Sequence, residues 1–122
     1  STSSGSASIG RAIEMMSARV TVRELIRARV YQEVTDYNRT PGEVFQGLVQ
    51  PTDAARTLNG YRMKKRRVLD WKAQFDKAVE AFERNGFFML VDDRQVESLD
   101  QEFDLGAETK VSFVKLVPLV GG

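Results

Sequence analysis

The sequence predicts an α+β fold, and three patterns along its 122 residues indicate this class. Apolar residues recur at helical spacing over residues 22–37 and again after Asp70. Runs rich in β-branched and aromatic residues follow at 87–91 and at 110–117, as is typical of strands. Helices followed by a group of strands, without regular alternation of the two, are typical of α+β domains. We expect residues 10–122 to form one such domain, because a chain of this length can bury one modest core.

The composition excludes several kinds of chemistry. The chain contains no cysteine and no histidine, so it cannot by itself form a disulfide, a thiolate metal site or a Ser-His-Asp triad. Its net charge of +1 gives no overall field that would attract nucleic acid or a membrane. No apolar run approaches the length of a membrane span and no signal peptide is visible, so we expect a cytoplasmic protein.

The N-terminal residues divide into a tail and two short extended segments. Residues 1–9 are nearly all small and polar, and they cannot bury enough apolar area to offset the entropy lost on ordering. We therefore expect a flexible tail there. Ile13 and Met15 alternate with small or polar residues, which predicts a short first strand, although the same residues could also form a helical turn. A second extended segment is expected at Arg19 and Val20.

The first helix has the clearest local signals. Thr21 and Glu24 have the spacing of a capping box, in which each side chain accepts a hydrogen bond from the other residue's backbone N–H. Apolar residues then recur at helical spacing as far as Tyr37. We predict an amphipathic helix over residues 22–37, with one face on the core and a mostly charged, solvated face opposite.

Residues 38–86 are interpreted as a helical insertion within the domain rather than as a second domain. A capping pattern with a proline predicts a short helix over 41–48, and a further helical turn is predicted over 53–58. A longer helix begins at the N-cap Asp70, carries an apolar stripe and stops at Gly86.

A basic cluster occupies residues 62–67, where five of the six side chains carry positive charge. Such a cluster can bind phosphates or an acidic partner. No aromatic residues are interleaved with it for base stacking, and Tyr61 stands alone beside it. We therefore expect a solvated loop and no nucleic-acid binding.

Strands dominate the C-terminal third of the chain. Residues 87–91 predict a buried strand, Asp92 and Asp93 a tight turn, and residues 94–96 the second strand of a hairpin. A polar link is expected over 97–105, with three apolar anchors: Leu99, Phe103 and Leu105.

The last predicted strand leads into an unusual end. A turn at 106–109 precedes the strand over 110–117, and residues 117–122 are expected to form an extended tail that finishes at Gly121 and Gly122. Glycine has no Cβ, so a partner can approach its backbone closely. An enzyme that threads a chain end down a narrow channel to the terminal carboxylate needs such an absence of side chains.

Four segments resemble the β-grasp ubiquitin-like family, and most of all its sulfur carriers: the small subunit of molybdopterin synthase and the sulfur carrier of the thiamine pathway. Residues 20–26 look like the entry into the first helix of these proteins, and residues 90–96 resemble their hairpin. Residues 105–113 resemble the turn into their last strand, and residues 116–122 resemble their Gly-Gly tail. The resemblance implies a mixed β-grasp sheet packed on a helix. The helical insertion departs from these compact proteins and is compatible with a bacterial ubiquitin-like modifier.

The resemblance also implies a function at the C-terminal carboxylate. A partner activating enzyme would use ATP to adenylate Gly122, and the activated carbonyl would then be transferred to a target. This chain would supply the reactive end and a docking surface, would bind no cofactor and would catalyse nothing itself. Further partners would be a conjugating enzyme and a deconjugating protease. Activation is implied for Gly121 and Gly122, and channel or partner docking for Phe113, Leu116, Val117, Pro118, Leu119 and Val120.

Other interpretations stay open. The chain could be a sulfur carrier whose Gly122 receives sulfur as a thiocarboxylate, with a sulfur acceptor as its partner. It could also be a non-conjugated β-grasp module that binds proteins and whose end is incidental. We do not expect an enzyme, because aspartates at a hairpin turn are favoured for backbone reasons. The carboxylates available for acid–base work or for Mg²⁺ would be Asp92, Asp93, Glu97 and Asp100.

Overall fold

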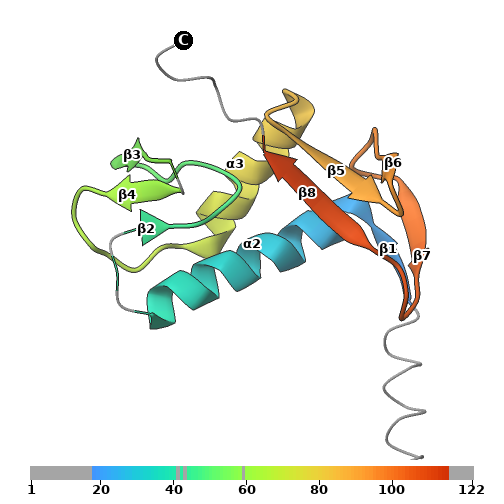
Figure 1. Ribbon diagram of the computed structural model, residues 1–122, viewed down its shortest axis with the longest axis horizontal. Coiled ribbons are helices and arrows are strands. Elements are labelled where there is room, and N and C mark those ends of the chain that lie inside the picture. The colour runs from blue at the N-terminus through green and yellow to red at the C-terminus, as the bar shows by residue number, and fades with distance from the viewer. Residues whose placement is uncertain (1–17, 41, 43, 59, 116–122) are drawn as a thin grey trace, which may run out of the picture.

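A computed structural model describes residues 18–40, 42, 44–58 and 60–115. Within these residues it contains two α-helices and eight short β-strands, which confirms the α+β class. Helix α2 (Val22–Arg39) and helix α3 (Trp71–Glu83) pack against each other, and strands lie at both ends of α2 (Figure 1). The tail at 1–9, the strand predicted at Ile13 and Met15, and the C-terminal tail all fall outside the described residues.

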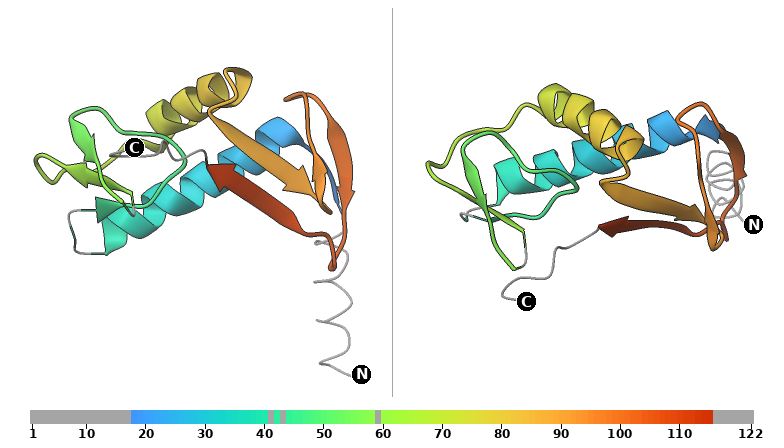
Figure 2. Two further views of the ribbon diagram at one scale, coloured as in Figure 1. Left: turned by 45° about the horizontal axis from the view of Figure 1, so that its top comes forward. Right: turned by 90° about the horizontal axis from the view of Figure 1, so that it is seen from above.

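The strands form three antiparallel sheets in the described part of the chain. A two-stranded ribbon pairs β1 (Ala18–Thr21) with β7 (Glu102–Leu105). The small sheet has the order β2-β4-β3 and consists of Val44–Phe45, Tyr61–Met63 and Ala54–Arg56. The main sheet has the order β6-β5-β8 and consists of Arg94–Gln95, Phe87–Val91 and Val111–Lys115. The small sheet and the main sheet lie at opposite ends of α2 (Figures 1 and 2).

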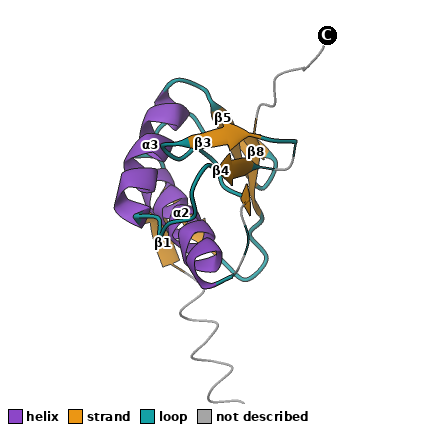
Figure 3. Cartoon of the chain, turned by 90° about the vertical axis from the view of Figure 1, so that its left-hand side faces the viewer, coloured by secondary structure: helices purple, strands orange, loops and turns teal. Residues whose placement is uncertain are grey.

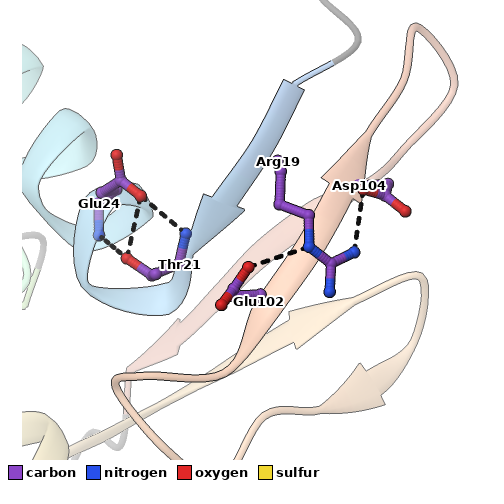
Figure 4. A network of polar contacts seen from close by, with 5 residues as sticks. All are labelled: Arg19, Thr21, Glu24, Glu102 and Asp104. Atoms are coloured by element: carbon purple, nitrogen blue, oxygen red, sulfur yellow. Dashed lines mark hydrogen bonds and ion pairs between the residues drawn. The ribbon is translucent and has the colours of Figure 1, made fainter.

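The predicted start of α2 is confirmed in detail. The Thr21 hydroxyl accepts a hydrogen bond from the backbone N–H of Glu24 at 3.1 Å (Figure 4). A carboxylate oxygen of Glu24 accepts one in return from the backbone N–H of Thr21 at 3.0 Å. The capping box therefore pairs backbone donors that the start of a helix leaves without intrahelical partners. The helix runs on to Arg39, slightly beyond the end predicted at residue 37.

The predicted limits of α3 are also confirmed. The Asp70 carboxylate accepts a hydrogen bond from the backbone N–H of Lys72 at 3.1 Å, as an N-cap does. At the other end, Asn85 adopts a positive φ of 61°, and the N–H of Gly86 donates to the carbonyl of Ala81 at 2.7 Å. This left-handed residue turns the chain out of the helix and into β5.

The hairpin of the main sheet forms where the sequence predicts it. Strands β5 and β6 are joined by Asp92 and Asp93, which have positive φ values of 49° and 67°. Two successive residues with positive φ match the right-handed twist of the strands that they join. Aspartate tolerates this conformation better than most residues, which explains its use here.

One cluster of buried apolar side chains joins both helices to both sheets. Alternate residues of β5 point into it, so that Phe87, Met89 and Val91 are nearly inaccessible to solvent. From the small sheet, the ring of Phe45 meets the ring of Tyr37 edge-on at 5.7 Å. Figure 3 shows the helix pair against these strands. The inserted residues therefore share the core of the domain.

Two helices predicted within the insertion are wrong. The described residues of 41–48 contain the strand β2, and those of 53–58 contain β3, with no helix in either range. Both strands pair with β4, and this pairing buries Phe45, Ala54 and Met63 while their neighbours face solvent. Tertiary burial thus outweighed the local capping and proline signals. Among its described residues, the insertion is helical only in α3.

The polar link predicted over 97–105 is wrong in its last part, which forms β7. Leu99 is buried as an anchor, as expected. The second extended segment, expected at Arg19, is confirmed as β1 and pairs with β7. The Arg19 guanidinium reaches Glu102 and Asp104, each at 3.0 Å, although Arg19 and Glu102 lie 83 residues apart in sequence (Figure 4). A pairing at such a separation has no local sequence signal.

Candidate functional site

Strand β8 leads directly to the predicted tail, so its end at Lys115 is the described part of the candidate site. The tail residues themselves lie outside the described part of the chain, and their positions are not assigned: Leu116, Val117, Pro118, Leu119, Val120, Gly121 and Gly122. Only Phe113 among the predicted docking residues can be placed.

Phe113 lies on the core-facing side of β8. Its ring centroid is 6.4 Å from that of Phe87, and the guanidinium carbon of Arg29 lies 5.0 Å from its ring centroid. The side chain is half-buried between the core and an arginine of α2. Much of the ring is therefore already in contact with this chain.

The opposite face of the main sheet carries an apolar surface that the sequence analysis missed. In the antiparallel register Phe88 pairs with Val114, and Leu90 pairs with Ser112, all on the face away from the core. Val114 is 42% exposed. Alternation along β8 is the signal that would have found this face, because an inward Phe113 requires an outward Val114. We call Phe88, Leu90 and Val114 the outer face.

Lys115 fixes the base of the tail to the small sheet. Its Nζ donates a hydrogen bond to the backbone carbonyl of Gly47 at 2.9 Å and lies 4.6 Å from the ring centroid of Tyr61. Burial lowers the pKa of the Lys115 amine, and the Glu33 carboxylate opposes that change. The last residue of β8 is thereby held by the insertion, far from it in sequence.

Glu33 on α2 holds the same loop from the other side. Its side chain is only 7% exposed, it receives a hydrogen bond from Arg29 at 2.8 Å, and it accepts one from the backbone N–H of Leu48 at 3.2 Å. Burial raises the pKa of the Glu33 carboxyl, while the hydrogen bonds from Arg29 and Leu48 oppose the rise. Through these hydrogen bonds, the buried Glu33 carboxylate connects α2 to the loop after β2.

Gly47 lies in the loop that both Glu33 and Lys115 bind. A Cβ at this position would overlap the ring of Phe45 and would also approach Glu33 closely. Only glycine lets the backbone pass between a core ring and the buried carboxylate. The close passage brings the Gly47 carbonyl within reach of Lys115.

The basic cluster at 62–67 is not only a solvated loop, because one of its arginines binds the end of α2. The Arg66 guanidinium donates to the carbonyls of Tyr37 at 2.8 Å and Thr40 at 2.9 Å, and also to that of Gly42. It also lies over the ring of Tyr37, with 4.3 Å between guanidinium carbon and ring centroid. These contacts fasten the loop after β4 to the end of α2.

Two of the carboxylates considered for an enzyme already bind a backbone N–H or an arginine of this chain. Asp92 accepts a hydrogen bond from the backbone N–H of Lys110 at 3.0 Å, and Asp100 lies 3.5 Å from Arg23. Among the described residues, no group of three or more acidic side chains could hold a metal ion. The structure therefore assembles no carboxylate centre from Asp92, Asp93, Glu97 and Asp100 in the part of the chain that it describes.

A scan against protein-family models, a search of curated proteins and a search of solved structures each gave no match to this chain. Neither described helix has the length and apolar character that crossing a membrane requires. The function must therefore be inferred from the residues of the chain itself.

Proposed function

We propose that this chain is a ubiquitin-like modifier of β-grasp fold whose Gly122 carboxylate is activated by a partner enzyme and transferred to a target. The observation that carries the proposal is the main sheet, in which the hairpin β5–β6 lies beside β8 and β8 leads straight into the tail. In a mixed β-grasp sheet, one strand must have a neighbour that runs parallel to it. The strand predicted at Ile13 and Met15 is the candidate, and β8 has an edge without a partner among the described residues.

In the proposed reaction, this chain supplies the carboxylate that becomes the electrophile, and its partners supply the catalysis. A carboxylate is a poor electrophile, so the Gly122 oxygen would attack the α-phosphorus of ATP and displace pyrophosphate. The resulting mixed anhydride has AMP as a good leaving group, which a thiol or amine then displaces. Because this chain has no cysteine, a thiol nucleophile would come from the activating enzyme or the target.

The outer face is the docking surface that we assign to the activating enzyme. It lies on β5 and β8, and β8 leads into the tail that this enzyme would have to receive. Its apolar side chains need a partner surface of the same character, because contact between such surfaces releases water. Phe113, by contrast, packs against the core and supports the sheet from within.

The test is to co-express the chain with the products of its neighbouring genes and to measure intact mass beside a Gly122 deletion. We expect adducts on other proteins with the intact tail and none with the deletion. The unconjugated mass also checks that Gly122 carries the terminal carboxylate. A chain in which sulfur replaces one terminal oxygen would instead establish the sulfur carrier. An unchanged mass with every neighbour present would reject activation and leave a protein-binding module.

The docking surface is tested with a pair of exposed valines. Val114→Ser should weaken activation, seen as a higher KM for this chain in ATP–pyrophosphate exchange. Val68→Ser is the matched control, because Val68 is 79% exposed but lies in the insertion. Equal effects of the two substitutions would show that the outer face has no special role.

A further inference from the structure

A groove lies beside the base of the tail, between the small sheet and α3. Its cavity volume is about 370 Å³, and Lys115 is one of its lining residues. The apolar part of the lining includes Leu48, Val49, Tyr61 and Ala81. The groove thus opens where β8 ends and the tail begins.

The groove is strongly cationic. Arg56, Lys77, Arg84 and Lys115 line it, and Glu80 is the only acidic residue among its lining residues. Glu80 pairs with Arg84 at 3.0 Å, but both side chains are largely exposed, so the pair is weak. Arg56 has no ion pair among the described residues. The groove would therefore accept an anion beside apolar side chains.

The segment that follows Lys115 combines apolar side chains with a possible anionic end. Residues 116–122 contain four large apolar residues and then two glycines, and the segment carries a carboxylate if Gly122 is the terminus. When extended, seven residues reach at most about 25 Å from Lys115, which itself lines the groove. We propose that this groove binds the tail of the same chain, with the Gly122 carboxylate among Arg56, Lys77 and Arg84.

A docked tail would control access to its own reactive end. The proposal rests on the proposed function for this consequence: an activating enzyme must withdraw the tail before it can adenylate Gly122. Binding by the groove lowers the fraction of chains that are competent for activation. Loss of the cations should therefore raise the rate of adenylation at low concentrations of the enzyme.

The docking itself can be tested without any enzyme. Because the full chain has no cysteine, a Val120→Cys variant can carry a single nitroxide label. We expect the label to broaden the backbone amide signals of Arg56, Lys77 and Glu80, which line the groove. Broadening confined to Lys115 and its neighbours, or spread evenly over the surface, would overturn the proposal. In a mixture of ¹⁵N protein without the nitroxide and spin-labelled protein, the ¹⁵N signals should show none of this broadening. Broadening in the mixture would mean that the tail binds another copy, which would also contradict the proposal.

The role of charge is tested with matched arginine variants. Arg56→Gln combined with Arg84→Gln should remove most of the broadening, whereas Arg94→Gln at the other end of the molecule should leave it unchanged. In the chain without a label, docking should hold the pKa of the Gly122 carboxyl below its usual range of about 3.3–3.7, followed by the amide shift of Gly122 with pH. The double variant should restore that range. Equal behaviour of the double variant and Arg94→Gln would contradict the proposal, while adduct formation would still decide the proposed function separately.

Discussion

The main sheet and the small sheet are held together in different ways. The main sheet relies on alternation, since β5 buries Phe87, Met89 and Val91 and turns its other residues outward. The small sheet has strands of only two or three residues, and side chains of α2, α3 and β8 bind the backbone of the loop between β2 and β3. Local pattern is therefore enough to specify the main sheet, whereas the small sheet depends on partners that are remote in sequence.

Two contacts show this dependence. The Gln74 side chain on α3 donates to the carbonyl of Val49 at 3.3 Å, 25 residues away in sequence. The Lys115 side chain on β8 donates to the carbonyl of Gly47 at 2.9 Å, 68 residues away. Such bonds satisfy backbone groups of the loop between β2 and β3 that the short strands leave unpaired. The small sheet is therefore built by its surroundings as much as by its own pairing.

The largest expected effect tests whether the two sheets form one cooperative unit. Phe45→Ala in the small sheet should lower the free energy of unfolding by about 3–5 kcal/mol, and Met89→Ala in the main sheet by about 2–5 kcal/mol. Both side chains are at most 1% exposed and belong to one core. Urea unfolding should show one transition by tryptophan fluorescence and by circular dichroism in both variants. Leu58→Ala, at an 88% exposed position, is the control and should change little.

If Phe45→Ala instead produced an early transition seen by only one probe, the small sheet would be a separate unit. The molecule would then consist of two independently stable parts. Hydrogen exchange at the amides of Tyr61 and Met89 would locate the part that opens first.

The second effect concerns the arginine that fastens the small sheet. Arg66→Met removes the donors to the carbonyls of Tyr37, Thr40 and Gly42, and should lower the free energy of unfolding by about 1.5–3 kcal/mol. Lys65→Met is the control, because Lys65 is exposed. Equal unfolding midpoints for the two variants would show that Arg66 adds no stability to the small sheet.

The third effect is local and lies near the main sheet. Thr21→Ala removes the hydroxyl that caps α2 and should lower the free energy of unfolding by about 1 kcal/mol. Thr35→Ala, inside the same helix, should be neutral or slightly stabilising, because alanine is the better helix former. Thermal unfolding of both variants compares the two positions directly, and a larger loss at Thr35 would contradict the assigned role of the cap.

The smallest effect is a pH dependence at the junction of the two regions. The folded state raises the pKa of Glu33, so the stability that this group contributes is present below its unfolded pKa of about 4.3. That contribution is lost as pH rises through the folded pKa. Gln in its place keeps an acceptor for the Leu48 N–H but cannot titrate. Wild-type stability should therefore fall relative to Glu33→Gln as pH rises from the unfolded pKa through the raised folded pKa.

Urea unfolding at several pH values measures this difference. Arg29 and Lys115 both face Glu33 and are present in both proteins, so the comparison isolates the effect of the Glu33 carboxyl. A difference that stays constant with pH, or grows in favour of the wild type, would contradict the raised pKa.

The candidate site was predicted only in part. Placement of the tail after a strand followed from residues 110–117, where β-branched residues dominate. The outer face could have been deduced from alternation in β8 but was not. The contact of Lys115 with Gly47 had no sequence signal, because it exists only once β8 and the loop after β2 meet at Glu33.

Several features of the fold could be predicted from the sequence because they depend on local interactions. The cap at Thr21, the stop at Gly86 and the turn at Asp92 and Asp93 are set by residues a few positions apart, so their hydrogen bonds and backbone angles can be read in order. Only the tertiary structure decided the β1–β7 ribbon and the small sheet. Their short strands gain too little from their own residues, and they become stable when helix, core and side-chain donors from elsewhere in the chain are already in place.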